Sequence, residues 1–231
     1  MRLFLLLLLA STHTIHAQFT AIPDTAFEQI LIFRGYDTGS PDGVVLTANI
    51  DTVTSLKVMG PAQVSDLTGI EDFAALTHLE CSFNLLTSLD LTQNTALTSL
   101  DCSHNQLTNL DISQNTGLTS LTCDNNELPN LDVTQQPTLT FLNCGYNPLG
   151  TIDLSQNTML EKLLCYNSEL VALDLTENTV LNYLRCDVNQ LTSLDLSQNT
   201  ELTILNVGDN QLTGLDVTSH SNLTYLHYYK N

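Results

Sequence analysis

Residues 97–117 read LTSLDCSHNQLTNLDISQNTG, and this 21-residue unit recurs along most of the chain. Leucine occupies its first, fourth and eleventh positions, and cysteine occupies its sixth. The first-position column is Leu76, Leu97, Leu118, Leu139, Leu160, Leu181, Leu202 and Leu223. The cysteine column is Cys81, Cys102, Cys123, Cys144, Cys165 and Cys186, continued by Val207 and Tyr228. Such a repeat predicts a solenoid, because one unit cannot bury its leucines without neighbours on either side.

The unit can be written L-x-x-L-x-C-x-x-N-x-L-x-x-L-D-[LIV]-[ST]-x-N-x-x. Its first half resembles the strand signature of leucine-rich repeats. The whole resembles the nested 21-residue repeats of bacterial secreted leucine-rich-repeat proteins, internalin-like in style. The resemblance implies a right-handed, β-rich leucine-rich-repeat solenoid with a parallel sheet on its concave face. Counting an irregular strand at Leu56-Lys57-Val58, we expect nine strands.

The segments before the regular repeats have separate roles. Residues 1–17 combine Arg2, a short leucine-rich stretch and a final Ala17, which predicts a signal peptide and a secreted or cell-surface protein. Residues 18–52 form the expected N-terminal cap. Within it, Pro23-Asp24 followed by Phe27, Ile30 and Leu31 and ending at Gly35 predicts a short capping helix. Residues 53–75 are interpreted as a first irregular repeat, and residues 76–231 as the 21-residue repeats.

The charge of the chain limits its partners. The formal net charge is −19, from 6 basic and 25 acidic residues. Bulk electrostatics therefore disfavour nucleic acid and anionic membranes, and the leader is too short to span a bilayer, so no membrane insertion is expected. The sequence stops at Asn231, midway through a unit and without a C-terminal cap. We expect either a fragment of a longer protein or end-to-end association through the open rung.

The six cysteines occupy equivalent inward positions on neighbouring strands. Side chains stacked in this register have poor disulfide geometry, and a straight column offers no tetrahedral metal site. Buried free thiols that act as small apolar side chains are therefore the favoured interpretation.

Two polar columns accompany the leucines. The asparagines at the turn after each strand are expected to bind free backbone groups, and Ser168 interrupts them, which predicts the softest turn there. An aspartate column in the second half of the unit is always followed two residues later by Ser or Thr: Asp90, Asp111, Asp132, Asp153, Asp174, Asp195 and Asp216. Local hydrogen bonding is the favoured role for these carboxylates, with calcium binding as a minor alternative.

Function is expected where the unit varies. The second half repeats nearly the same letters, whereas the outward positions of the first half differ from one unit to the next. These positions contain Lys57, Lys162, Arg185 and Lys230 and five of the seven tyrosines, and tyrosine and arginine are enriched at binding hot spots. The candidate binding residues are Phe141, Tyr146, Lys162, Tyr166, Tyr183, Arg185, Tyr225 and Tyr229. Aromatic residues also stabilise sheets without binding anything, so a purely structural role stays open.

No catalytic or cofactor motif accompanies these residues. Asp101, Ser103 and His104 have the letters of a triad but come from one strand, whereas a triad needs side chains that converge on a pocket. The sequence therefore favours a non-enzymatic module that binds a protein, peptide or glycan on its concave face. The alternative is a structural or adhesive surface scaffold without a specific ligand.

Overall fold

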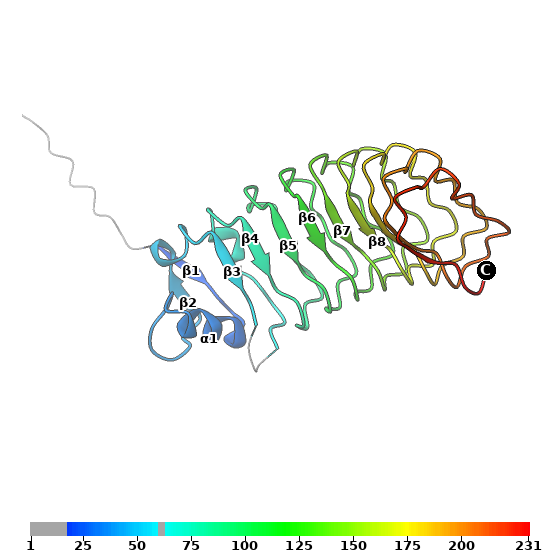
Figure 1. Cartoon of the computed structure of the whole chain (residues 1–231). Helices are drawn as coiled ribbons and strands as arrows, with labels where there is room; N and C mark the ends of the chain where they lie inside the picture. Colours follow the sequence, from blue (N-terminus) through cyan, green and yellow to red (C-terminus); the bar gives the residue numbers. More distant parts are fainter. Residues whose placement is uncertain (1–17, 60–62) are drawn as a thin grey trace, which may run out of the picture.

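A nine-stranded parallel sheet forms one side of a solenoid (Figure 1). The computed structural model describes residues 18–59 and 63–231, so the predicted signal peptide lies outside the described residues. The strands are β3 (Ser55–Lys57), β4 (His78–Glu80), β5 (Ser99–Asp101), β6 (Ser120–Thr122), β7 (Phe141–Asn143), β8 (Lys162–Leu164), β9 (Tyr183–Arg185), β10 (Ile204–Asn206) and β11 (Tyr225–His227). Each strand pairs only with its neighbours in sequence. The predicted solenoid and its nine strands are confirmed.

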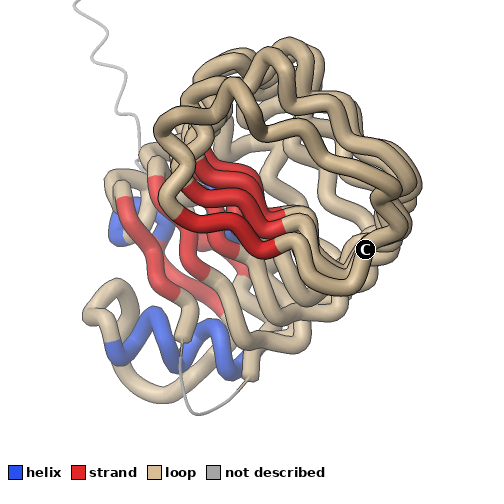
Figure 2. The backbone as a smooth tube through the Cα atoms, turned by 45° about the vertical axis from the view of Figure 1, so that its right-hand side comes forward, coloured by secondary structure: helices blue, strands red, loops and turns tan. Residues whose placement is uncertain are grey.

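The register of the sheet follows the repeat. The middle leucine of each strand pairs with the middle leucine of the next, as Leu100 pairs with Leu121. Figure 2 shows the strands on a single side of each coil, with loops and turns completing the circuit. A strand of three residues buries only its middle side chain, so the parallel stacking has to repeat at every rung to make a continuous core.

The core consists of leucine columns and the thiol column. All six cysteines are fully buried and free, as the sequence predicted. Burial raises the pKa of each thiol, that of Cys144 to about 12. A thiolate is the reactive form of cysteine, so these thiols are inert side chains of the core.

The asparagine column after the strands links each rung to the previous one. The Asn105 amide donates to the carbonyls of Cys81 and Cys102, both at 3.0 Å, and its oxygen accepts from the backbone N–H of Leu86 at 3.0 Å. Equivalent bonds recur at Asn126, Asn147 and Asn210. The side chain thus satisfies backbone groups that the bend leaves without partners.

Ser168 changes the backbone around it. Its hydroxyl reaches the Cys144 carbonyl at only 3.4 Å and has no amide oxygen to offer to the previous rung. The Leu149 N–H bonds instead to the Asn147 carbonyl at 2.8 Å, and Gly150 takes a φ of +67°. The interruption seen in the sequence is therefore a local rearrangement of two successive turns.

A second amide column was not predicted. Asn115 is fully buried and donates to the carbonyls of Leu91 (3.1 Å) and Asn94 (2.9 Å). In the described part of the chain, the amide oxygens of this column have no hydrogen-bond partner: Asn94, Asn115, Gln136, Asn157, Asn178 and Asn199. The amide nitrogens secure the carbonyls of the preceding rung, while the oxygens stay unpaired in the interior.

The aspartate column makes the local bonds that were expected. Each carboxylate accepts from the backbone N–H two residues further on, as Asp111 does from Ser113 at 2.9 Å. These bonds from the backbone and from the Ser or Thr hydroxyl lower the pKa of all seven carboxyls. The column therefore shapes the second half of every rung while keeping its charge.

The N-terminal segment closes the first rung. Helix α1 (Thr25–Phe33) begins at Asp24, whose carboxylate accepts from the N–H groups of Ala26 and Phe27, and it lies where the capping helix was predicted. Phe27 is fully buried and its ring lies 6.4 Å from that of Phe73. An antiparallel pair, β1 (Phe19–Ala21) and β2 (Val44–Leu46), flanks the helix and was not predicted. Two short 3₁₀ helices follow, at Thr47–Asn49 and Ile70–Asp72.

Within the described residues, no helix has both the length and the apolar character needed to cross a bilayer.

Candidate binding surface

The outer side of the parallel sheet, called here the strand face, consists of two columns of side chains and the turn residues that follow them. The first column contains Ser55, His78, Ser99, Ser120, Phe141, Lys162, Tyr183, Ile204 and Tyr225. The second column contains Lys57, Glu80, Asp101, Thr122, Asn143, Leu164, Arg185, Asn206 and His227. Paired strands lie ~4.8 Å apart, so a ligand lying along the sheet would meet one residue of each column per rung.

The two halves of the strand face differ in chemistry. From β3 to β6 both columns hold small or charged side chains, including the carboxylates of Glu80 and Asp101. From β7 to β11 the same columns hold the aromatic rings of Phe141, Tyr183 and Tyr225 and no carboxylate. The half between β7 and β11, called here the aromatic half, is therefore the part suited to hot-spot contacts.

A left-handed turn ends every rung beside this surface. At one equivalent position of every unit the φ lies between 50° and 57° although the residue is not glycine: Phe83, His104, Asn125, Tyr146, Asn167, Val188, Asp209 and Lys230. Glu169, next to Ser168, is an additional left-handed residue with a φ of 57°. At the equivalent positions up to Asp209, the N–H donates to a carbonyl of the next rung, as Tyr146 does to Tyr166 at 2.9 Å. The turn thereby fixes Tyr146 at the edge of the aromatic half.

Tyr146, Tyr166, Arg185 and Asp187 form a continuous stack across three rungs. The Tyr146 and Tyr166 rings meet edge to face with centroids 5.3 Å apart, and the Arg185 guanidinium lies 4.3 Å from the Tyr166 centroid. Asp187 accepts from Arg185 Nε at 3.0 Å and from Nη2 at 3.1 Å, and this hydrogen bonding raises the pKa of Arg185. Held from both sides, the arginine keeps one orientation, so little conformational entropy remains to be lost on binding.

Gly145 gives Tyr166 room to lie flat. A Cβ at this position would come within 2.9 Å of two atoms of the Tyr166 ring. The tyrosine therefore packs onto the backbone of the previous rung, and burial raises the pKa of its hydroxyl. Any side chain larger than hydrogen at Gly145 would displace the whole stack.

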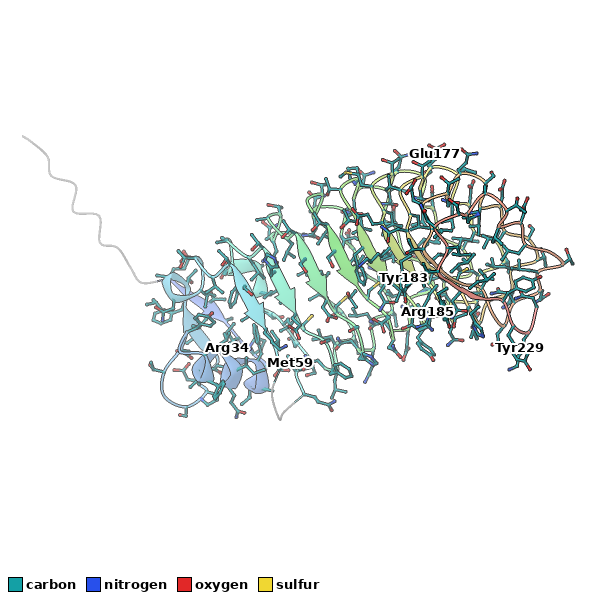
Figure 3. The ribbon with its side chains drawn as sticks, viewed as in Figure 1. Arg34, Met59, Glu177, Tyr183, Arg185 and Tyr229 are labelled. Atoms are coloured by element: carbon teal, nitrogen blue, oxygen red, sulfur yellow. The ribbon has the colours of Figure 1, made fainter. Side chains whose placement is uncertain are left out.

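An open groove of about 540 Å³ lies next to this stack, over β9 to β11. It is lined by Tyr183, Arg185, Ile204, Asn206, Thr224, Tyr225 and His227. His227 Nδ1 lies 2.9 Å from the Asn206 side-chain oxygen, which fixes the imidazole at the end of the second column. Figure 3 shows Tyr183 and Arg185 next to each other on the strand face, with Tyr229 further along toward the C-terminal end.

The half of the strand face from β3 to β6, with the turns that follow these strands, has its own network of contacts. Asp124 is only 6% exposed, and its carboxylate accepts from Asn125 Nδ2 at 2.7 Å and Asn143 Nδ2 at 2.8 Å. Burial raises the pKa of this carboxyl. Ser103 is buried and its hydroxyl is bound to Asp101, while the His104 ring lies against Phe83 at 4.1 Å between centroids.

Among the described residues, no three His, Cys, Asp or Glu side chains gather closely enough to hold a metal ion.

Comparisons with known proteins agree with this architecture. No protein-family model matches the chain, and no curated protein matches it. The functional domain of InlJ from Listeria monocytogenes is 38% identical, with a TM-score of 0.75 over 91% of this chain. The chain is an internalin-like leucine-rich-repeat protein. It spans 52% of the InlJ chain, which includes a cysteine ladder similar to the stacked thiols described above.

Two further structures show the same fold at lower identity. Internalin C2 from Listeria monocytogenes is 23% identical with a TM-score of 0.65, and the match covers 91% of this chain and 97% of that one. The ectodomain of the plant membrane receptor kinase GASSHO1/SCHENGEN3 from Arabidopsis thaliana is 20% identical, with a TM-score of 0.70 over 79% of this chain and 25% of its own. That ectodomain was solved in complex with CASPARIAN STRIP INTEGRITY FACTOR 2.

The structure of this internalin-like protein divides the predicted residues into three groups. Phe141, Lys162, Tyr183 and Tyr225 lie in the first column, and Tyr146, Tyr166 and Arg185 meet in the stack. Tyr229 belongs to neither group, and the centroid of its ring lies 5.6 Å from Lys230 Nζ. Asp187, Ile204, Asn206 and His227 occupy outward positions of the first half of the unit but were not among the candidate residues, and Thr224 was in neither set. Thr224 gave no signal, because threonine is common at its position in the unit.

Proposed function

We propose that this protein is an exported, non-enzymatic bacterial module that binds a protein, peptide or glycan on the aromatic half of its strand face. The preformed Tyr146–Tyr166–Arg185–Asp187 stack beside the groove is the observation that supports this most strongly. Tyrosine and arginine dominate binding hot spots, and a surface already fixed by its own contacts loses less entropy on association.

Two other observations favour a ligand over a purely structural role. A sheet gains stability from aromatic pairs on any of its strands, yet the tyrosines gather on one half of this face. A plant receptor ectodomain with the same fold was solved in complex with CASPARIAN STRIP INTEGRITY FACTOR 2, which is a precedent for the architecture and not for the ligand.

The test is capture of a partner from the surroundings of the native organism. The protein and a variant with Tyr166→Ser, Tyr183→Ser and Arg185→Ser would be immobilised side by side. A matched control would change Gln114, Gln156 and Gln198 to serine, because these exposed side chains lie in the constant second half of the unit. We expect the strand-face variant to lose the captured partner and the control to keep it, with circular dichroism unchanged in both.

Equal capture by all three proteins would contradict the proposal and would favour the structural or adhesive scaffold.

A further inference from the structure

The two strand columns of the aromatic half hold cations and no carboxylate, although the protein as a whole is strongly acidic; the carboxylates of Asp187 and Asp209, in the turns that follow, are paired with Arg185 and Lys230. The chain has 25 acidic and 6 basic residues, yet the two columns from β7 to β11 contain Lys162, Arg185 and His227 and no carboxylate. The same columns from β3 to β6 do contain carboxylates. An acidic ligand would therefore be repelled by most of the surface and accepted only here.

Lys162 is the free cation of this region. In the described part of the chain, carboxylates lie within 4.0 Å of Lys57, Arg185 and Lys230, whereas no such pair includes Lys162. The side chain is exposed and stands between Phe141 and Tyr183 in the first column. Its charge is thus available to a ligand on an otherwise apolar row.

Arg185 presents a second donor one strand away. Its Nε and Nη2 are bound to Asp187, which leaves Nη1 outside that pair. The guanidinium is delocalised and stacks on Tyr166, so Nη1 projects from a fixed plane. Lys162 and Arg185 stand on the adjacent strands β8 and β9 but in different columns, so a peptide that crosses both strands would meet a cation on each.

The groove beside these cations provides an apolar contact. Ile204 lies between Tyr183 and Tyr225 in the first column, and Tyr225 is 53% exposed. The volume of about 540 Å³ can hold one or two large side chains.

We infer that the aromatic half binds an acidic peptide segment of a partner protein, with acidic side chains at Lys162 and at Arg185 and apolar side chains in the groove over Ile204. This inference rests on the proposed function and specifies the ligand of the same surface. Tyrosine- and arginine-rich clusters are typical of protein contacts, which favours a peptide over an anionic glycan.

The probe is a random copolymer of glutamate and tyrosine, with a copolymer of lysine and tyrosine as its charge-reversed control. Binding would be measured by calorimetry at low and high salt on the protein, on Lys162→Gln and on Lys57→Gln. The last variant removes an exposed lysine from the same columns outside the aromatic half. We expect the acidic copolymer to bind with an affinity that falls as salt rises, drops about fivefold in Lys162→Gln and stays unchanged in Lys57→Gln. The lysine copolymer, which the acidic surface attracts in general, should bind the three proteins alike.

Failure of the acidic copolymer to bind, binding of it that is the same in Lys162→Gln as in the parent protein, or equal loss in the two lysine variants would overturn the inference. Binding of polygalacturonate that depends on Lys162, without binding of the acidic copolymer, would overturn the peptide in favour of an anionic glycan. If the strand-face triple variant loses its captured partner while the acidic copolymer fails to bind, the proposed function stands and this inference fails.

Discussion

Val188 has a left-handed backbone with φ of 57°, although a β-branched side chain is poorly tolerated there. The residue is 46% exposed, so its side chain contributes little burial in return. Asn167 occupies the same position one unit earlier with φ of 50°, and asparagine adopts this conformation far more readily. The turn therefore imposes strain on some rungs and not on others.

Changing Val188→Asn should raise the free energy of unfolding by about 1 kcal/mol, because the turn keeps its shape and the strain is relieved. The reverse change, Asn167→Val, should lower it by a similar amount. Denaturant titration of both variants measures the two effects. An Asn167→Val protein with the same free energy of unfolding as the parent would show that valine adopts the left-handed conformation at little free-energy cost.

Asp111 is exposed to solvent, yet its carboxylate accepts hydrogen bonds from Ser113. Bonds from Ser113 lower the pKa of its carboxyl below the ordinary 3.8. A depressed folded-state pKa means that its stabilisation is present above the unfolded pKa and is lost as pH falls through the folded value. We expect Asp111→Ala to lower the melting temperature at neutral pH, and the difference from the parent protein to shrink below pH 4. A difference that is constant with pH would mean that the carboxylate charge plays no part.

At the scale of elements, the turn around Ser168 lacks the acceptor that asparagine provides elsewhere. Ser168→Asn would place an amide oxygen near the Leu149 N–H, which now bonds within its own turn. One hydrogen bond contributes about 1 kcal/mol, so unfolding should become more difficult by about that amount. The matched change Asn126→Ser should destabilise by more, because Leu107 N–H and two carbonyls would lose their partner. If Ser168→Asn destabilises the protein, the rearranged turn is the better fit to its neighbours.

The thiol column gives a second test at this scale. Six buried thiols with raised pKa should not react with an aromatic disulfide reagent in the folded protein, and all six should react after denaturation. Release of two thiols or fewer from the denatured protein would show that disulfides form instead.

The elements that the sequence predicted well are those whose side chains repeat. The leucine columns place all nine parallel strands, and Asp24 with the apolar spacing after it places α1. The pair β1 and β2 was missed because each strand has three residues and their pairing joins positions about 25 residues apart, with helix α1 between them. The packing of side chains between rungs could not be predicted from the repeat pattern either. The fit of Tyr166 over Gly145 and the burial of Asp124 depend on side-chain directions that spacing alone does not define.

At the scale of the whole molecule, the net charge of −19 includes a straight row of seven ionised aspartates. Like charges about one strand spacing apart repel each other, and salt screens that repulsion beyond a Debye length of about 10 Å at 0.1 M. The melting temperature should therefore rise with sodium chloride. Calcium chloride at the same ionic strength should give the same rise, because one oxygen of each carboxylate is already bonded to backbone. An additional shift at low calcium would support the calcium alternative.

The asparagine bonds that link each rung to the one before it give the solenoid a constant rise per repeat. Most rungs present the same donors and acceptors to the next rung. A gene that gains or loses the 63 nucleotides of one unit would therefore lengthen or shorten the solenoid by one strand spacing of ~4.8 Å and keep the hydrogen bonds between rungs. The length of the solenoid and the binding chemistry of its strand face could then evolve separately. Duplication of whole units would change the length, and single substitutions on the sheet would change the chemistry. The turn at Ser168 interrupts this regular bonding between rungs, and a duplication that includes it would have to reproduce two rearranged turns together.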